Sequence, residues 1–381
     1  MGKWEQSLLE LIRRASCELT QDVLTAISKA AKAEDAQSSA AAALDLVWES
    51  VAIAKKTGAP LLADPVIPHF YVTTPPQFDA LAFRKAAEEA IAAATKAGYL
   101  QPELEDLVSG RGAKSNVGEG SPFLHFHAEE RKNVEVRVVL DTGVAHGPGA
   151  HYTLPDEAIG AARDLNGVRR AALHALVRAH GSGIGPGVLA IGIGGDRASG
   201  HALAHQQFLR PLGEKSRVKA LAQLEARILE DANSLGIGPM GFGGKNVLLG
   251  VKIASQLSSI SHAHVSICYL GWAMRRHGAA LDAKGAIADW LYELPREKQP
   301  PVKSAAKKPA PAPVASTETP AETAKKAAKK TSKAATKTTK DAAPKAAKTK
   351  KAPAKATKKK TTTKKTAKPA AKSTAARKKK S

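Results

Sequence analysis

The chain has 381 residues, and its 58 Lys and Arg outnumber its 35 Asp and Glu. Its two cysteines, Cys17 and Cys268, exclude a disulfide framework and indicate a reducing compartment, so we expect a cytoplasmic protein. No apolar run approaches the ~20 residues of a membrane span, and the N-terminus lacks the apolar core of a signal peptide. We therefore expect no membrane partner.

The positive charge is concentrated at the C-terminal end. Residues 301–381 hold 26 Lys and Arg against 3 acidic residues, whereas residues 1–300 hold 32 of each. The C-terminal segment consists almost entirely of Lys, Ala, Thr and Pro, and such a composition buries too little apolar surface to fold. We predict a folded domain over residues 1–297 and a disordered basic tail over residues 298–381.

The predicted elements of the folded domain alternate between helices and short strands. Helical spacing of apolar residues predicts helices over residues 4–57, with Thr20 as an N-cap within them, and an extended segment follows at 61–73. Alternation predicts paired strands at 123–129 and 134–140. Further helices are predicted at 78–97, 154–163, 168–180, 201–208, 218–235 and 283–292, further strands at 188–193 and 261–270, and a break at 271–278. This order indicates an α/β or α+β fold, with mixed short-strand sheets flanked by helices.

The run from Leu235 to Ile253 holds six glycines within fifteen residues. A chain needs so many glycines where its backbone approaches another group closely or takes up positive φ, which indicates a binding or catalytic loop. It is not a phosphate-binding P-loop, because Lys245 is followed by Asn246 rather than by Ser or Thr. The alternative is that the glycines only allow tight packing.

Histidines form the other candidate site. His201 and His205 are four residues apart on one face of a predicted helix, a spacing that suits two ligands of one metal ion. Two further pairs share a strand face, namely His125 with His127 and His262 with His264. A mononuclear Zn or Fe(II) site is one interpretation. Ordinary hydrogen-bonded histidines are the other.

Residues 15–280 resemble the α-subunit, or N-terminal domain, of class I fumarases and L-tartrate dehydratases, which are iron–sulfur hydro-lyases. The segments that carry the resemblance are residues 19–24, 53–60, 116–118, 190–195 and 235–253. The resemblance implies reversible hydration of a small dicarboxylate or dehydration of the corresponding hydroxy acid, with a [4Fe–4S] cluster as cofactor. The family's C-terminal domain has no counterpart in this chain, so we expect a separate β-subunit and an oligomer.

The resemblance also shows where this chain departs from the family. The three cluster cysteines of the family fall at Leu62, Ile184 and Cys268, so one of three is retained. Such a cluster needs three or four protein sulfurs, and nothing places Cys17 near the others. A family histidine falls at Gln256. We therefore expect the cluster ligands to be largely lost.

Other site residues follow from the resemblance alone. Asp64 stands at the position of the family's proposed acid/base residue, although an Asp before Pro65 is also common in turns. Lys114, where the family has an arginine, and Asn116 are expected to shape the anion site. The glycines expected to join them are Gly194, Gly195, Gly241, Gly243 and Gly244.

The tail resembles the C-terminal tails of linker histones and bacterial histone-like proteins in composition. Flexible lysines neutralise phosphates and release counterions, so we expect sequence-independent binding to nucleic acid or another polyanion, and association with the nucleoid. Without aromatic residues the tail offers no base stacking. The alternative is a solubilising spacer. Two functions are thus open: a hydro-lyase, or a non-catalytic, cluster-less homologue that binds a polyanion through its tail.

Overall fold

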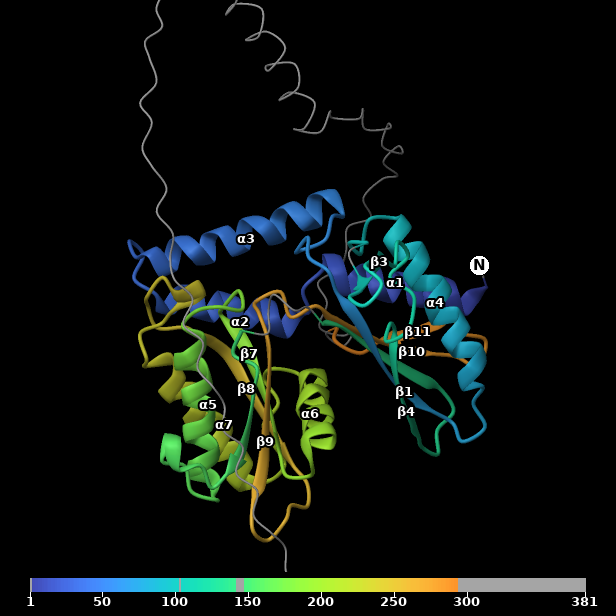
Figure 1. Ribbon diagram of the computed structural model, residues 1–381. Helices are drawn as coiled ribbons and strands as arrows, with labels where there is room; N and C mark the ends of the chain where they lie inside the picture. The colour runs from blue at the N-terminus through green and yellow to red at the C-terminus, as the bar shows by residue number, and fades with distance from the viewer. Residues whose placement is uncertain (1, 103, 142–146, 294–381) are drawn as a thin grey trace, which may run out of the picture. The chain divides into compact units, whose positions relative to one another are not determined.

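The computed structural model describes residues 2–102, 104–141 and 147–293 (Figure 1). The chain divides into two units, Met1–Val302 and Lys303–Ser381, and the predicted tail lies outside the described residues. The helices are α1 (Lys3–Cys17), α2 (Gln21–Ala33), α3 (Ser39–Thr57), α4 (Ala80–Lys96), α5 (Leu165–Ala179), α6 (Arg197–Gln206) and α7 (Lys219–Asn233), with short 3-10 turns η2 (Glu157–Ile159), η3 (Gln207–Leu209) and η4 (Pro239–Gly241). None of the described helices is long and apolar enough to cross a membrane.

The strands form two larger sheets and one short hairpin. The first sheet has the order β11-β10-β5-β1-β4, the second has the order β6-β9-β7-β8, and β2 pairs with β3. The strands are β1 (Ile67–Thr74), β2 (Glu105–Asp106), β3 (Arg111–Gly112), β4 (Phe123–Ala128), β5 (Val134–Asp141), β6 (Ala150–Leu154), β7 (Gly187–Ile193), β8 (Leu248–Ser255), β9 (Ala263–Leu270), β10 (Arg276–Leu281) and β11 (Ile287–Trp290). The mixed sheets and helices confirm the predicted α+β class.

The first sheet buries one apolar face under α1 and α4 (Figure 1). Phe70 and Val72 of β1 point to this face, where they pack in one core with Leu11 of α1 and Ile91 of α4. Side chains alternate along a strand, so the residues between them point to the opposite face. That opposite face carries polar side chains and forms part of the candidate site.

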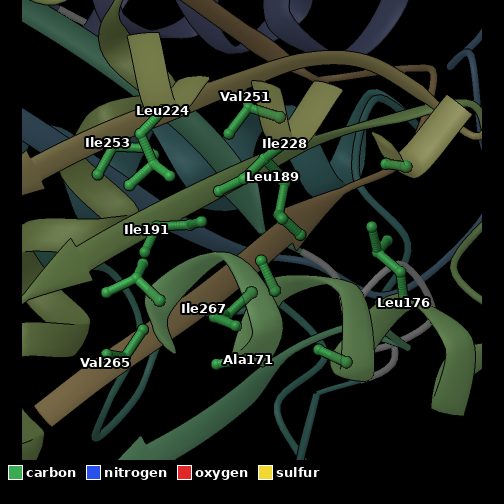
Figure 2. Close-up of a cluster of buried hydrophobic side chains, with 14 of the residues drawn as sticks. Ala171, Leu176, Leu189, Ile191, Leu224, Ile228, Val251, Ile253, Val265 and Ile267 are labelled. Carbon is green, nitrogen blue, oxygen red and sulfur yellow. The ribbon is translucent and has the colours of Figure 1, made fainter. Parts of the chain in front are cut away.

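The second sheet is apolar on both faces. Leu189 and Ile191 of β7 pack with residues of α5 and α7, as Figure 2 shows for Leu176 and Ile228. The alternate residues of β7 belong to another apolar cluster that also includes Ala204 of α6. Strands buried on both faces read as continuous apolar runs, which is the pattern of residues 188–191.

Four predicted features of the secondary structure differ from the structure. Strands were predicted correctly at 123–129 and 134–140, but they do not pair with each other, because β1 lies between them, parallel to β4 and antiparallel to β5. The helix predicted at 154–163 is only the single turn η2, since Asp156 caps its start and Gly160, at φ 60°, ends it.

The helix predicted at 283–292 is strand β11, which forms a hairpin with β10. Local turn chemistry decides this, because the Asp282 carboxylate accepts hydrogen bonds from the backbone N–H groups of Lys284 and Ala286, and Gly285 has φ 83°. The break predicted at 271–278 contains the start of β10.

A buried guanidinium joins the first sheet to α2 and η3. Arg276 of β10 is fully buried, forms an ion pair with Asp22 of α2, and donates to the carbonyl oxygens of Phe208 (2.5 Å) and Arg210 (2.6 Å). Its guanidinium also lies 4.6 Å from the ring centroid of Tyr292. Removing it would leave two carbonyl oxygens without this donor and the Asp22 carboxylate without its cationic partner.

We therefore expect Arg276→Met to lower the free energy of unfolding by about 3–5 kcal/mol, measured by urea denaturation, because it breaks a buried pair. The matched control is Arg227→Met, whose side chain is 66% exposed and lies 4.0 Å from Asp231. This control should stay within about 0.5 kcal/mol of the wild type. Equal effects of the two substitutions would contradict a structural role for Arg276.

Candidate functional site

The polar face of the first sheet gathers groups from three strands. His69 and Tyr71 alternate with the apolar residues of β1 and so point away from α1 and α4. Tyr71 pairs with His125 of the neighbouring β4, and their rings stack at 4.4 Å. The register of β5 places Asp141, its last residue, on this same face. Two imidazoles, a phenol and a carboxylate therefore converge there.

Helix α6 brings a third imidazole to the carboxylate. His205 is buried, and its Nε2 lies 3.1 Å from Oδ2 of Asp141. Its Nδ1 lies 2.6 Å from the hydroxyl of Tyr71, so both ring nitrogens have partners on the first sheet. Because α6 itself packs on β7 and β9, these hydrogen bonds connect the two sheets.

His69 approaches the same carboxylate from β1. Its Nε2 lies 4.0 Å from Oδ2 of Asp141, its Nδ1 lies 3.3 Å from Nε2 of His125, and its ring stacks on that of His205 at 4.5 Å. Burial, and then the neighbouring His205, lower the pKa of His69 to about 3. The ring is therefore neutral near neutral pH, which is the form that binds metals.

Cys268 of β9 lies beside these groups. A cavity of about 240 Å³ is lined by Cys268, Asp141, His201 and His205, together with Gly149, Ala150, Phe208, Ile267 and Tyr269. The Cys268 thiol is 3.4 Å from Nδ1 of His201. Burial, and then the Asp141 carboxylate, raise the pKa of Cys268 to about 12. The thiol is therefore protonated near neutral pH.

The other two cysteine positions of the resembled family are aliphatic here. Leu62 and Ile184 pack against the same apolar cluster that contains Cys268, beside Trp272 and Met274. The remaining cysteine of the chain, Cys17, lies on α1, where its thiol is 3.3 Å from the Gly58 carbonyl oxygen. A [4Fe–4S] cluster needs more thiolates than this site offers, so the residues present do not fit it.

Asp64 is held in an ion pair close to position 62. Its carboxylate lies 2.7 Å from Nη1 of Arg275, and the same Nη1 donates to the carbonyl oxygen of Leu62 at 3.2 Å. Both side chains are nearly buried. Burial lowers the pKa of Arg275, and the Asp64 carboxylate opposes this effect. The carboxylate predicted to transfer protons thus has a fixed cationic neighbour.

Lys114 and Asn116 lie in the loop that precedes β4. Lys114 is exposed, whereas Asn116 is fully buried with φ 57°. The Asn116 amide nitrogen donates to Oγ1 of Thr95 (3.2 Å) and to the Gln101 carbonyl oxygen (2.7 Å). The side-chain amide of Asn116 therefore contacts α4 and the segment after it.

The predicted glycines do not meet at one place. Gly194 and Gly195 follow β7, while Gly241, Gly243 and Gly244 precede β8. Since β7 and β8 are parallel, the two groups lie at opposite ends of the strand pair, separated by roughly eight residues or 25 Å. All five glycines have positive φ, which is one of the two reasons for glycine expected in the run before β8.

The glycine loop before β8 binds a carboxylate of the chain itself. The backbone N–H groups of Lys245 and Asn246 donate to the Glu34 carboxylate at 2.9 Å, and the Asn246 side chain donates to it at 2.6 Å. An internal anion from the end of α2 therefore occupies the donors at this loop. The turn at Gly194 instead contacts Gln256, whose amide nitrogen lies 3.5 Å from the Gly194 carbonyl oxygen.

Sequence reasoning identified His201, His205 and Cys268 but missed His69, Tyr71 and Asp141. A signal for the missed residues is present. Polar residues alternate with apolar ones through β1, and Asp141 ends β5 directly after the apolar run Val138–Leu140. The sequence does not show which side chain each of these residues contacts, because that side chain comes from a distant segment of the chain.

The chain belongs to the fumarate hydratase (fumerase) family, whose description matches residues 5–280. It is 37% identical over 297 residues to a protein provisionally named class I fumarate hydratase from Geobacillus stearothermophilus, covering 77% of this chain and 58% of that protein. It is 31% identical over 282 residues to a protein provisionally named L(+)-tartrate dehydratase subunit alpha from Methanocaldococcus jannaschii, covering 73% of this chain and 98% of that protein. It is 25% identical over 210 residues to L(+)-tartrate dehydratase subunit alpha of Escherichia coli K12, covering 54% and 67%. The match therefore spans little more than half of the Geobacillus protein and nearly all of the Methanocaldococcus subunit.

We expect Tyr71→Phe to lower the free energy of unfolding by about 1–3 kcal/mol, because it leaves a buried ring nitrogen of His205 without its partner. Tyr152→Phe is the matched control. Its hydroxyl contacts Nδ1 of His174 at 2.8 Å, but His174 is half-buried and water can replace the lost group. The control should lose no more than about 1 kcal/mol in thermal denaturation. An equally large loss of unfolding free energy in Tyr152→Phe would contradict the importance of the Tyr71–His205 hydrogen bond for stability.

Proposed function

We propose that this chain is the α-type component of a hydro-lyase that acts on a small hydroxy-dicarboxylate without a [4Fe–4S] cluster. Family membership supports the reaction class. The observation that carries the proposal is the cavity at Cys268, which is lined by Asp141, His201 and His205. The two other cysteine positions of the family hold aliphatic side chains.

Removing water from a hydroxy acid needs one group that takes a proton from carbon and one that protonates the leaving hydroxyl. Imidazoles and carboxylates supply both roles when they reach the substrate. The cavity offers these groups, and we retain Asp64 as the candidate for proton transfer because it lies beside position 62. The roles of Lys114, Asn116 and the glycines in an anion site stay predictions.

A dicarboxylate also needs cationic partners. Among the described residues that line the cavity, none is Lys or Arg. Two relatives are named as alpha subunits of a dehydratase. We therefore propose that a separate β-subunit supplies the groups that bind the substrate carboxylates, and that the active protein is an oligomer.

The test is turnover of fumarate, malate and tartrate by the aerobically purified full chain, alone and mixed with a β-type subunit. We expect turnover without acid-labile sulfide, and Asp64→Asn should lower kcat by at least about 100-fold. Asp45→Asn, on the exposed surface of α3, should leave kcat unchanged. A brown protein whose turnover requires iron and sulfide would contradict the cluster-free mechanism, and a folded but inactive pair of subunits would contradict hydro-lyase function.

A second candidate function rests on the charge of the C-terminal segment. Residues 301–381 hold 26 Lys and Arg against 3 acidic residues, and the remainder of the chain is neutral. We propose that this segment binds nucleic acid or another polyanion without regard to base sequence, since phosphate neutralisation and counterion release depend on charge alone. Such binding is compatible with either an active or an inactive domain.

Gel shift with duplex DNA tests this candidate, comparing the full chain with a variant that ends at residue 300. We expect binding by the full chain only. If ten lysines engage the duplex, log K should fall with log salt at a slope of about −9. Equal shifts for both proteins, or no shift for either, would exclude DNA as the partner of the segment.

A further inference from the structure

We propose that His69, Asp141 and His205 form a binding site for one divalent transition-metal ion, Zn²⁺ or Fe²⁺. Each residue presents one ligand atom, and these atoms all lie within 4.8 Å of one another. The proposal concerns binding alone and stands whether or not the chain is a hydro-lyase. Two imidazoles and one carboxylate are a ligand set that both ions accept in proteins.

The distances fit a mononuclear centre. Oδ2 of Asp141 lies 3.1 Å from Nε2 of His205 and 4.0 Å from Nε2 of His69. Bonds of about 2.0–2.2 Å to one ion place neighbouring ligand atoms roughly 3–3.6 Å apart. The His205–Asp141 pair already has this separation, and the His69–Asp141 pair is within about 1 Å of it. The third pair, between the two imidazoles, lies within 4.8 Å, so the rings must draw together when they bind the ion.

The surroundings orient both imidazoles for a metal. Each ring directs Nε2 toward the carboxylate, while its Nδ1 has another partner. This partner is the Tyr71 hydroxyl for His205, at 2.6 Å, and the His125 ring for His69, at 3.3 Å. Metal-binding histidines are held in this way, because the second contact fixes the tautomer and the plane of the ring. A chance contact between two histidines would not need a second contact at Nδ1 to hold each ring in place.

The site has room for further ligands. Asp141 and His205 both line the cavity of about 240 Å³, which His201 and Cys268 line as well. Three protein ligands leave at least one coordination position for water or a substrate oxygen, as in catalytic rather than structural sites. The Cys268 thiol contacts His201 and is not one of the three proposed ligands.

Another histidine pair makes a weaker candidate. Nε2 of His151 lies 3.1 Å from Nδ1 of His264, on adjacent strands β6 and β9. Their other hydrogen-bonding neighbours are the hydroxyls of Ser266 and Thr153, which are poor ligands for these ions. Within the part of the chain that the structure describes, His69, Asp141 and His205 are the one group of three metal-binding side chains whose ligand atoms all lie within 4.8 Å of one another.

Metal titration of the untagged full chain tests the proposal. After treatment with a chelator, the protein is titrated with Zn²⁺ and with Co²⁺ and its metal content is measured. We expect about one ion per chain. The Co²⁺ spectrum should show d–d bands without the strong sulfur-to-cobalt band of a thiolate ligand. Less than half an ion per chain, or a strong thiolate band that assigns Cys268 as a ligand, would overturn the proposed ligand set.

Variants separate this site from other histidines. Asp141→Asn and His205→Ala should abolish stoichiometric binding, while Tyr71→Phe should weaken it about 10–100-fold through the orientation of His205. His174→Gln, on α5, is the matched control and should bind like the wild type. Circular dichroism checks folding, and Tyr71→Phe decides the outcome if the ligand variants do not fold. Wild-type affinity in a folded Tyr71→Phe variant, or weakened binding in the control, would overturn the proposal.

Discussion

The buried carboxylate of Asp141 is the group on which the arrangement of the site depends. Withdrawing a carboxylate from water costs several kcal/mol unless neighbouring groups compensate. His205 compensates directly at 3.1 Å, and Tyr71 holds the other side of that ring. Because His205 comes from a helix that packs on the second sheet, its hydrogen bond to this carboxylate of the first sheet forms only when both sheets are in place. The hydrogen bonds of His205 therefore tie the position of α6 to the polar face of the first sheet.

Local chemistry could be predicted from the sequence, and long-range partners could not. The four-residue spacing of His201 and His205 places both on one face of a helix, which α6 confirms. Yet His205 meets a carboxylate 64 residues away, and His201 meets a thiol 67 residues away. Likewise, the clustering of glycines predicted close approach or positive φ, but only the parallel pairing of β7 with β8 shows that the two glycine groups lie at opposite strand ends.

Ile184 shows how the scaffold keeps a conformation that its residue does not favour. It is β-branched with φ 58°, a region that costs such residues on the order of 1–3 kcal/mol. The backbone N–H of Trp272 donates to the Ile184 carbonyl oxygen at 3.0 Å. Gly271, which has no side chain, leaves space for that oxygen. Apolar burial of the Ile184 side chain offsets part of the strain. Neighbouring residues, rather than the intrinsic preference of Ile184, therefore fix the backbone where the resembled family has a cysteine.

Family membership thus explains the scaffold more fully than it explains the chemistry. The segments at Leu62 and Ile184 contribute packing, whereas the polar groups around Cys268 come from β1, β5 and α6. The two sets meet at Cys268 and Phe208, which both line the cavity and belong to the apolar cluster. A reaction in this cavity would therefore be carried by imidazoles and a carboxylate. The Asp141 carboxylate repels a dicarboxylate unless a cation lies between them, so whatever binds such a substrate here must bring positive charge to Asp141.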